Sequence, residues 1–284
     1  MGMFTLLKLA CVVGMLSVLG YQSPAQEPPR RSSHAHAAEV PVICPTWSEV
    51  LPQWVVMITW DPSGSVQQPA RDQTGRIRTD AMTLTERLPP ATLVLGHYIA
   101  EHSYGDEGFL RDAIPAAPAA APCHITNIWD PRQKQACRQH ERRYTAQLAC
   151  VTAARERITG TLRDLTPARA ARTDVWGAMA VAAEIMQSYP HSRRLLVVYS
   201  DLEDNVSTRQ RPTQGRKAQR ISQPPLPALP GLQGVTVVVR APRTDPRAAA
   251  RHVAAFQRHL TGWGATVTVV PFEVPWQGVL SDNS

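Results

Sequence analysis

The stretch that decides the fold runs from Trp54 to Val66, WVVMITWDPSGSV. Its apolar and β-branched residues continue without interruption until an aspartate, which is typical of a strand buried on both faces. Three side chains with oxygen atoms then follow at alternate positions, namely Asp61, Ser63 and Ser65, and Gly64 allows a tight turn between the serines. A buried strand with this ending indicates a polar site at its carboxyl end.

The same apolar character recurs in later segments of the chain. These segments are residues 91–100, 193–200, 234–241 and 264–272. Helical patterns accompany them at residues 75–88, 132–165, 173–187 and 246–261. Runs of Val, Ile and Leu that alternate with helices predict an α/β fold with an open, mainly parallel sheet and helices on both faces.

Composition places the chain among globular proteins. With 284 residues and 43% hydrophobic residues it can bury a sizeable core, and its net charge of +7 permits anionic partners. We expect one domain over residues 46–275, with a helical insertion at 105–165 and an Arg/Pro-rich loop at 203–233. The flanking parts are expected to be a signal peptide (1–25), a flexible lead-in (26–45) and a C-terminal tail (276–284).

The N-terminus has the features of an export signal. Lys8 precedes an apolar run from Leu9 to Tyr21, and Ser23, Pro24 and Ala25 supply the small residues of a cleavage site. The apolar run is short for a membrane span, so we predict cleavage near Ala25, with an uncleaved anchor as the alternative. The mature protein is then periplasmic, on the cell surface or secreted, with no transmembrane span.

The cysteines agree with export. Cleavage leaves Cys44, Cys123, Cys137 and Cys150, an even number, and disulfides are expected outside the cytoplasm. The helix predicted at 132–165 places Cys137 and Cys150 roughly 20 Å apart, too far for one bridge. Two pairings stay open: Cys44–Cys150 with Cys123–Cys137, or Cys44–Cys137 with Cys123–Cys150. We prefer the first, because its shorter loop closes at a lower entropic cost.

The same long helix carries an apolar stripe at helical spacing. Its members are Cys137, Tyr144, Leu148, Val151, Ile158, Leu162 and Leu165. Such spacing predicts that this side of the helix packs against the core.

Clusters of small polar residues follow three of the predicted elements. Besides Asp61 to Ser65, the sequence has Arg172-Thr173-Asp174 before a helix and Ser200-Asp201 after a strand. Hydroxyls and carboxylates are hard oxygen donors, suited to Mg²⁺, Mn²⁺ or Ca²⁺ and poor ligands for zinc or copper. Because ligands bind outside the carboxyl ends of parallel strands, we expect these clusters to meet there.

In this order and context the three clusters resemble the metal-ion-dependent adhesion site of the von Willebrand factor type A family. The resemblance covers most of residues 54–272. It implies that Ser63, Ser65 and Thr173 donate hydroxyl oxygens to an ion, and that Asp61 and Asp201 hold the ion directly or through water. It further implies that an acidic group of a protein partner completes the coordination, so that the activity is cation-dependent binding and not catalysis.

The chain departs from the family pattern at three positions. Arg172 and Leu202 stand where the family commonly has glycine, and Pro62 stands where a β-branched residue is usual. Proline fixes φ and can stiffen the turn. Arg172, a cation beside a cation site, is the departure that most concerns the binding of metal.

Two other functions use residues of the same chain. In a Mg²⁺-dependent phosphohydrolase Asp61 would be the nucleophile, with His97 as a base, but hydrolase and phosphate-loop motifs are absent from the sequence. An anionic surface or polyanion would bind the basic residues of 207–220 and of the long helix. Those of the helix are Arg132, Lys134, Arg138, Arg142 and Arg143. Few aromatic residues accompany them, which disfavours nucleic acid as the partner.

Overall fold

The structure is a computed structural model, and it describes Cys44 and most of residues 52–281. The internal gaps are 64–72, 102, 104–107, 118–122, 124, 127–128, 168–169, 171, 203–227 and 241–245. The predicted signal peptide, the lead-in apart from Cys44, and most of the loop at 203–233 therefore lie outside the described residues. Ser65 lies outside them as well.

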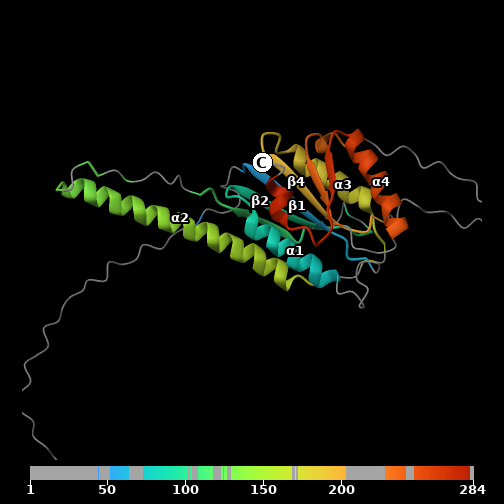
Figure 1. Cartoon of the computed structure of the whole chain (residues 1–284), viewed down its shortest axis with the longest axis horizontal. Coiled ribbons are helices and arrows are strands. Elements are labelled where there is room, and N and C mark those ends of the chain that lie inside the picture. The colour runs from blue at the N-terminus through green and yellow to red at the C-terminus, as the bar shows by residue number, and fades with distance from the viewer. Residues whose placement is uncertain are drawn as a thin grey trace, which may run out of the picture. The chain divides into compact units, whose positions relative to one another are not determined.

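A six-stranded sheet with the order β3-β2-β1-β4-β5-β6 forms the centre of the domain (Figure 1). Its strands are β1 (Trp54–Trp60), β2 (Thr92–Tyr98), β3 (Leu110–Ile114), β4 (Arg193–Tyr199), β5 (Thr236–Val239) and β6 (Thr266–Val269). Neighbouring strands are parallel except β2 and β3, which are antiparallel. The α/β fold class and the five strands predicted from the sequence are confirmed.

Helices cover both faces of this sheet (Figure 1). They are α1 (Gln73–Arg87), α2 (Pro131–Asp164), α3 (Val175–Gln187), α4 (Pro246–Gly262) and α5 (Trp276–Ser281), with a 3-10 turn η3 at Pro230–Leu232. Alternate residues of β1 enter opposite cores: Val55 and Met57 pack with α3 and α4, whereas Val56 and Ile58 pack with α1, α2 and α5. Burial on both faces is the reason that β1 reads as a continuous apolar run.

The short elements β3 and α5 are additions to the predicted fold. β3 lies inside the stretch 105–165, which was expected to be helical, and α5 lies in the expected tail. β3 has five residues, of which Arg111 is exposed and Asp112 is half-buried. It is an edge strand of the sheet and pairs with β2. Segments this short do not develop a recognisable period in the sequence.

Helix α2 is confirmed in its position but only its C-terminal half packs as predicted. From Val151 onward its buried side chains include Ile158 and Leu162, which contact α1 and the sheet. Leu148, earlier in the same stripe, is 39% exposed. The prediction that core packing accounts for the whole stripe is therefore wrong for the N-terminal half, which extends past the edge of the sheet (Figure 1).

The two disulfides of the structure are the preferred pairing. Cys44 is bonded to Cys150 and Cys123 to Cys137, with Cα–Cα distances of 5.4 and 5.5 Å. Their presence is compatible with an exported protein. Of the helices in the described part of the chain, none has the length and apolar character needed to cross a membrane.

Candidate functional site

The fold brings the three polar clusters to one edge of the sheet. β1 and β4 are parallel neighbours in register, and the amide of Asp61 donates to the carbonyl of Tyr199 at 2.9 Å where both strands end. The amide of Asp174 donates to the carbonyl of Ala100 at 3.2 Å, which fixes the start of α3 beside the end of β2. Residues more than a hundred positions apart thus meet at the carboxyl ends of β1, β2 and β4.

The carboxylate of Asp61 lies at the centre of this site and is fully buried. Its Oδ1 accepts the backbone amide of Ser63 at 2.9 Å, and the hydroxyl of Thr173 lies 3.5 Å from the same oxygen. Its Oδ2 accepts the hydroxyl of Ser200 at 2.7 Å. One carboxylate therefore contacts a backbone amide of its own cluster and hydroxyl groups of the other two.

Four of the five predicted site residues fall within the described part of the chain, and the structure brings them together. Asp61, Ser63, Thr173 and Asp201 are each at most 5% exposed. Asp201 is close enough for its charge to act on Asp61. The position of Ser65, the fifth, is not among those described.

Ser200 is a site residue for which the sequence predicts no role. Its hydroxyl lies 2.7 Å from Asp61 Oδ2, closer than the Ser63 amide or the Thr173 hydroxyl lies to Oδ1. The available signal was its position, because a residue directly after a buried parallel strand faces the same edge as one after the neighbouring strand.

Burial dominates the electrostatics of the site. Desolvation raises the pKa of Asp61 from 3.8 to about 6, although hydrogen bonds from Ser200 and Ser63 act in the opposite direction. Repulsion by the carboxylate of Asp201 also raises the pKa of Asp61. The site thus holds two buried acids near each other, an arrangement that costs free energy at neutral pH and favours a positively charged ligand.

The turn after β4 has an unusual backbone at Leu202. This residue has φ of 61°, in the left-handed region, and its amide donates to Ser200 Oγ at 2.9 Å. Leucine rarely adopts this conformation, and it is here that the resembled family commonly has glycine. The surrounding contacts, including the hydrogen bond to Ser200 Oγ, therefore hold the turn in a conformation that costs free energy.

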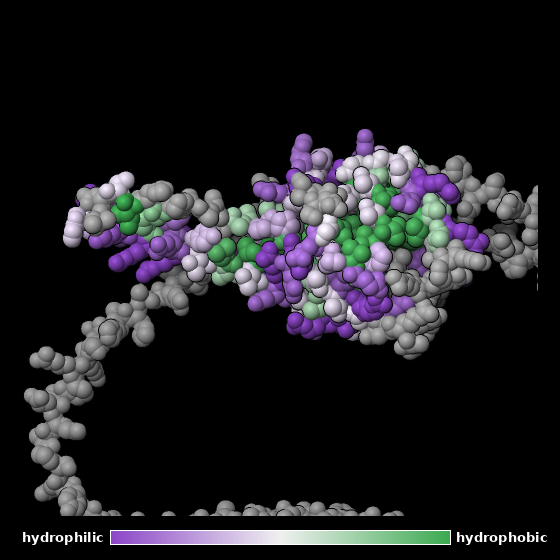
Figure 2. Space-filling view, in the orientation of Figure 1, coloured by the Kyte–Doolittle hydropathy of each residue, from purple (hydrophilic) through white to green (hydrophobic). Residues whose placement is uncertain are grey.

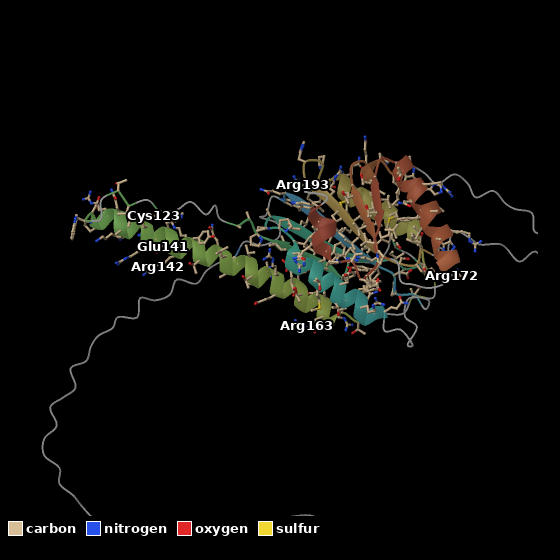
Figure 3. The ribbon with its side chains drawn as sticks, viewed as in Figure 1. Cys123, Glu141, Arg142, Arg163, Arg172 and Arg193 are labelled. Carbon is tan, nitrogen blue, oxygen red and sulfur yellow. A yellow bond between two sulfur atoms is a disulfide. The ribbon has the colours of Figure 1, made fainter. Side chains whose placement is uncertain are left out.

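Arg172 does not point its charge into the site. Its Nη1 lies 3.1 Å from Oε1 of Glu101, and both side chains are about two-fifths exposed, at 41% and 40%. Figure 3 labels Arg172 at the edge of the domain. The next residue, Thr173, is buried against Asp61. The departure from the family pattern at position 172 is thus accommodated by an ion pair on the rim.

The donor set fits a small, hard divalent cation. Among the described residues no group of three or more His, Cys, Asp or Glu side chains is placed to hold a metal ion. The site instead offers hydroxyl oxygens and two carboxylates, the ligands that Mg²⁺, Mn²⁺ and Ca²⁺ prefer. Two buried acids would also be neutralised by one divalent ion.

His97, the candidate base of the enzyme alternative, is a buried residue of β2. Its exposed fraction is 5%, and its Nδ1 lies 2.7 Å from the carbonyl oxygen of the adjacent Tyr98. This contact agrees with a packing role for the imidazole.

The raised pKa of Asp61 predicts how stability depends on pH. Asp61→Asn is expected to raise the free energy of unfolding at pH 8, in EDTA, by up to about 3 kcal/mol, because it removes a buried charge whose pKa is raised by about two units. Below about pH 4 both states of the wild type hold the proton, so the two proteins should be equally stable. As the pH rises from about 4 to 6, Asp61 ionises in the unfolded wild type before it ionises in the folded protein, so the free energy of unfolding of the wild type falls.

Urea titrations at pH 4, 5, 6 and 8 measure this difference. The matched control is Asp164→Asn at the exposed C-terminal end of α2, which should follow the wild-type profile. An Asp61→Asn protein that is no more stable than wild type at pH 8 would contradict the assignment of a costly buried charge.

Comparisons with known proteins give likenesses of fold. No family model matches the chain, and no curated protein matches its sequence. The structure is similar to a von Willebrand factor type A structure from Catenulispora acidiphila, with a TM-score of 0.44 and 13% identity. The match covers 82% of this chain and 41% of that one, so this chain spans less than half of that structure's length. It is also similar to an aerotolerance-related membrane protein from Bacteroides fragilis (0.41, 14%, with 81% of this chain and 98% of that one).

A third similar structure is proximal thread matrix protein 1 from the mussel byssus, solved with a zinc-occupied adhesion-site motif. Its TM-score is 0.42 at 10% identity, and the match covers 82% of this chain and 45% of that one. At such low identity these are similarities of overall shape. The fold of this chain is defined by its own strand order, an α/β arrangement of six mostly parallel strands between helices.

Proposed function

We propose that this protein binds a divalent cation of the Mg²⁺ class, including Mn²⁺ and Ca²⁺, and through it a protein partner. The ligands would be Asp61, Ser63, Ser65, Thr173 and Asp201. The observation that carries the proposal is the fully buried carboxylate of Asp61 at the meeting point of three hydroxyl-bearing segments. A buried anion of this kind is costly unless a cation or a proton compensates its charge.

The hydrogen bonds to Asp61 place neighbouring hydroxyl groups where they could act as ligands of a cation. When the hydroxyls of Thr173 and Ser200 donate to Asp61, their oxygen lone pairs stay available for another ligand. Asp61 would therefore orient hydroxyl ligands as well as supply negative charge. A bound ion would supply positive charge and an open coordination position for an anionic group of the partner.

The same contacts favour binding over catalysis. Asp61 accepts hydrogen bonds from hydroxyls and a backbone amide, groups that do not ionise near neutral pH and are poor general acids or bases. Turnover of a phosphate ester by the cation-loaded protein would favour the phosphohydrolase alternative. The two disulfides support a protein that works outside the cytoplasm.

A calorimetric titration of Mg²⁺ into the mature chain tests the proposal. We expect one ion per chain, and we expect Thr173→Val to weaken binding by about 10- to 100-fold, because valine keeps the shape and removes the hydroxyl. The matched control is Thr161→Val on the exposed side of α2, which should bind like the wild type. Absence of binding by the wild type, or equal binding by the folded Thr173→Val protein, would refute the metal site.

A further inference from the structure

The N-terminal half of α2 buries almost nothing of its own chain. Among residues 131–149 only Cys137 is buried, whereas the remainder of the helix packs on the domain. Nineteen helical residues have a length of about 28 Å. We call these residues, together with the described residues from Cys123 to Asp130, the arm. Figure 3 labels Cys123, Glu141 and Arg142 on this part of the molecule.

The arm is held in a fixed conformation. The Cys123–Cys137 disulfide attaches the incoming segment to the helix, and Cys44–Cys150 fixes the root of the arm. Asp130 caps the helix by accepting the amide of Arg132 at 2.8 Å. A rigid surface loses little conformational entropy when it binds a partner.

The exposed side of the arm is strongly basic. Its cationic residues are Arg132, Lys134, Arg138, Arg142 and Arg143, and all five are exposed. At 100° per residue they occupy about half of the helix circumference, on the side away from Cys137 and its attached segment. Glu141 is the one exposed acid on residues 131–149. Figure 2 shows hydrophilic residues along this part of the molecule, with a hydrophobic spot at the tip.

Apolar side chains accompany the charges at the tip. Trp129 is 82% exposed and Ile125 is 39% exposed. The Nζ of Lys134 lies 6.0 Å from the centre of the Trp129 ring. Tryptophan beside lysine and arginine is characteristic of segments that lie in the headgroup region of a membrane.

We propose that the arm docks on an anionic phospholipid surface. Its cationic face is convex and broad, so it suits mobile headgroups that can arrange around it better than a partner with fixed charges. Basic residues near such a surface are attracted to its anionic headgroups, and Trp129 can add apolar contact at the interface. The role is separate from the cation site and does not depend on it.

Sedimentation with lipid vesicles in EDTA tests this role. The chain from residue 26 onward is expected to bind vesicles of equal parts POPC and POPG. It should lose most of this binding when NaCl rises from about 50 to about 500 mM. Lys134→Gln/Arg138→Gln/Arg142→Gln should weaken binding by at least about tenfold, which corresponds to about 1.4 kcal/mol. Trp129→Ala should weaken it severalfold. Glutamine preserves helix propensity, which circular dichroism can verify.

The matched control removes the same charge elsewhere. Arg87→Gln/Arg251→Gln/Arg258→Gln changes three exposed arginines of α1 and α4 and should bind within about twofold of wild type. An equal loss of vesicle binding in the two triple variants would show that net charge alone determines binding, and this would overturn the proposal. Binding to pure POPC that salt does not change would overturn it as well. Binding to heparin or polyglutamate but not to vesicles would also overturn the proposal, and it would indicate that the arm binds a soluble polyanion.

Discussion

Cys44→Ser/Cys150→Ser is expected to lower the free energy of unfolding by about 4 to 5 kcal/mol, because this disulfide joins residues 106 positions apart. Closing so long a loop removes much of the entropy of the unfolded chain. The bond reaches α2 at Cys150, next to Val151, where the helix begins to pack on the core. Urea titration of the oxidised proteins, followed by tryptophan fluorescence, measures the change.

The second disulfide provides the matched control. Cys123–Cys137 joins residues 14 positions apart on the arm, away from both core clusters. Cys123→Ser/Cys137→Ser should therefore change global stability by less than about 1 kcal/mol, while amide hydrogen exchange in residues 131–149 becomes faster. Similar losses of global stability in the two double variants would show that the arm unfolds together with the domain.

Asp80→Ala is expected to cost about 3 to 5 kcal/mol, since it leaves the fully buried guanidinium of Arg240 without its counter-charge. Arg240 Nε lies 3.2 Å from Asp80 Oδ2, close enough for an ion pair although its N–H is not aligned for a hydrogen bond. The hydroxyl of Tyr199 donates to the same Oδ2 at 2.8 Å. Burial raises the pKa of Asp80, and the charge of Arg240 opposes this rise.

This network also fixes the end of β4. Tyr199 directly precedes Ser200, and the Arg240 guanidinium lies 4.1 Å above the ring of Trp276 in α5. The network thus links α1, β4 and α5 beside the candidate cation site. Asp80→Ala should consequently also weaken Mg²⁺ binding.

A double-mutant cycle separates the ion pair from packing. Asp80→Ala/Arg240→Met should recover most of the stability lost in Asp80→Ala, because it removes the unpaired buried charge. Glu273→Ala breaks the exposed ion pair with Arg76 and should cost less than about 1 kcal/mol. Additive effects of the two changes at positions 80 and 240 would contradict the proposed coupling.

Much of this fold was predictable because its central strands are buried on both faces. β1 reads as an apolar run in which Thr59 is the one polar residue, and β4 continues as an apolar run after Arg194. Helices α1 and α3 end close to the predicted positions. The candidate site was suggested by the same runs, since Asp61 follows β1 directly and Asp201 follows β4 after Ser200. The preferred disulfide pairing followed from helix geometry and loop length.

Other features depend on contacts that leave no local pattern. Ser200 acquires its role from the parallel register of β1 and β4, and the pairing of Arg172 with Glu101 joins residues from different turns. The Asp80–Arg240 pair is likewise long-range. Leu148 has the helical spacing of a core residue, but spacing cannot indicate where the neighbouring surface ends.

Uptake of Mn²⁺, counted from the electron paramagnetic resonance signal of the free ion, tests the central claim most directly. At pH 7.5 the wild-type chain from residue 26 onward should take up one Mn²⁺, and an excess of Mg²⁺ should displace it. Asp61→Asn should take up none at the same concentrations while keeping its fold. Absence of uptake by the wild type at millimolar Mn²⁺, or undiminished uptake by Asp61→Asn, would contradict a cation site built around this buried carboxylate.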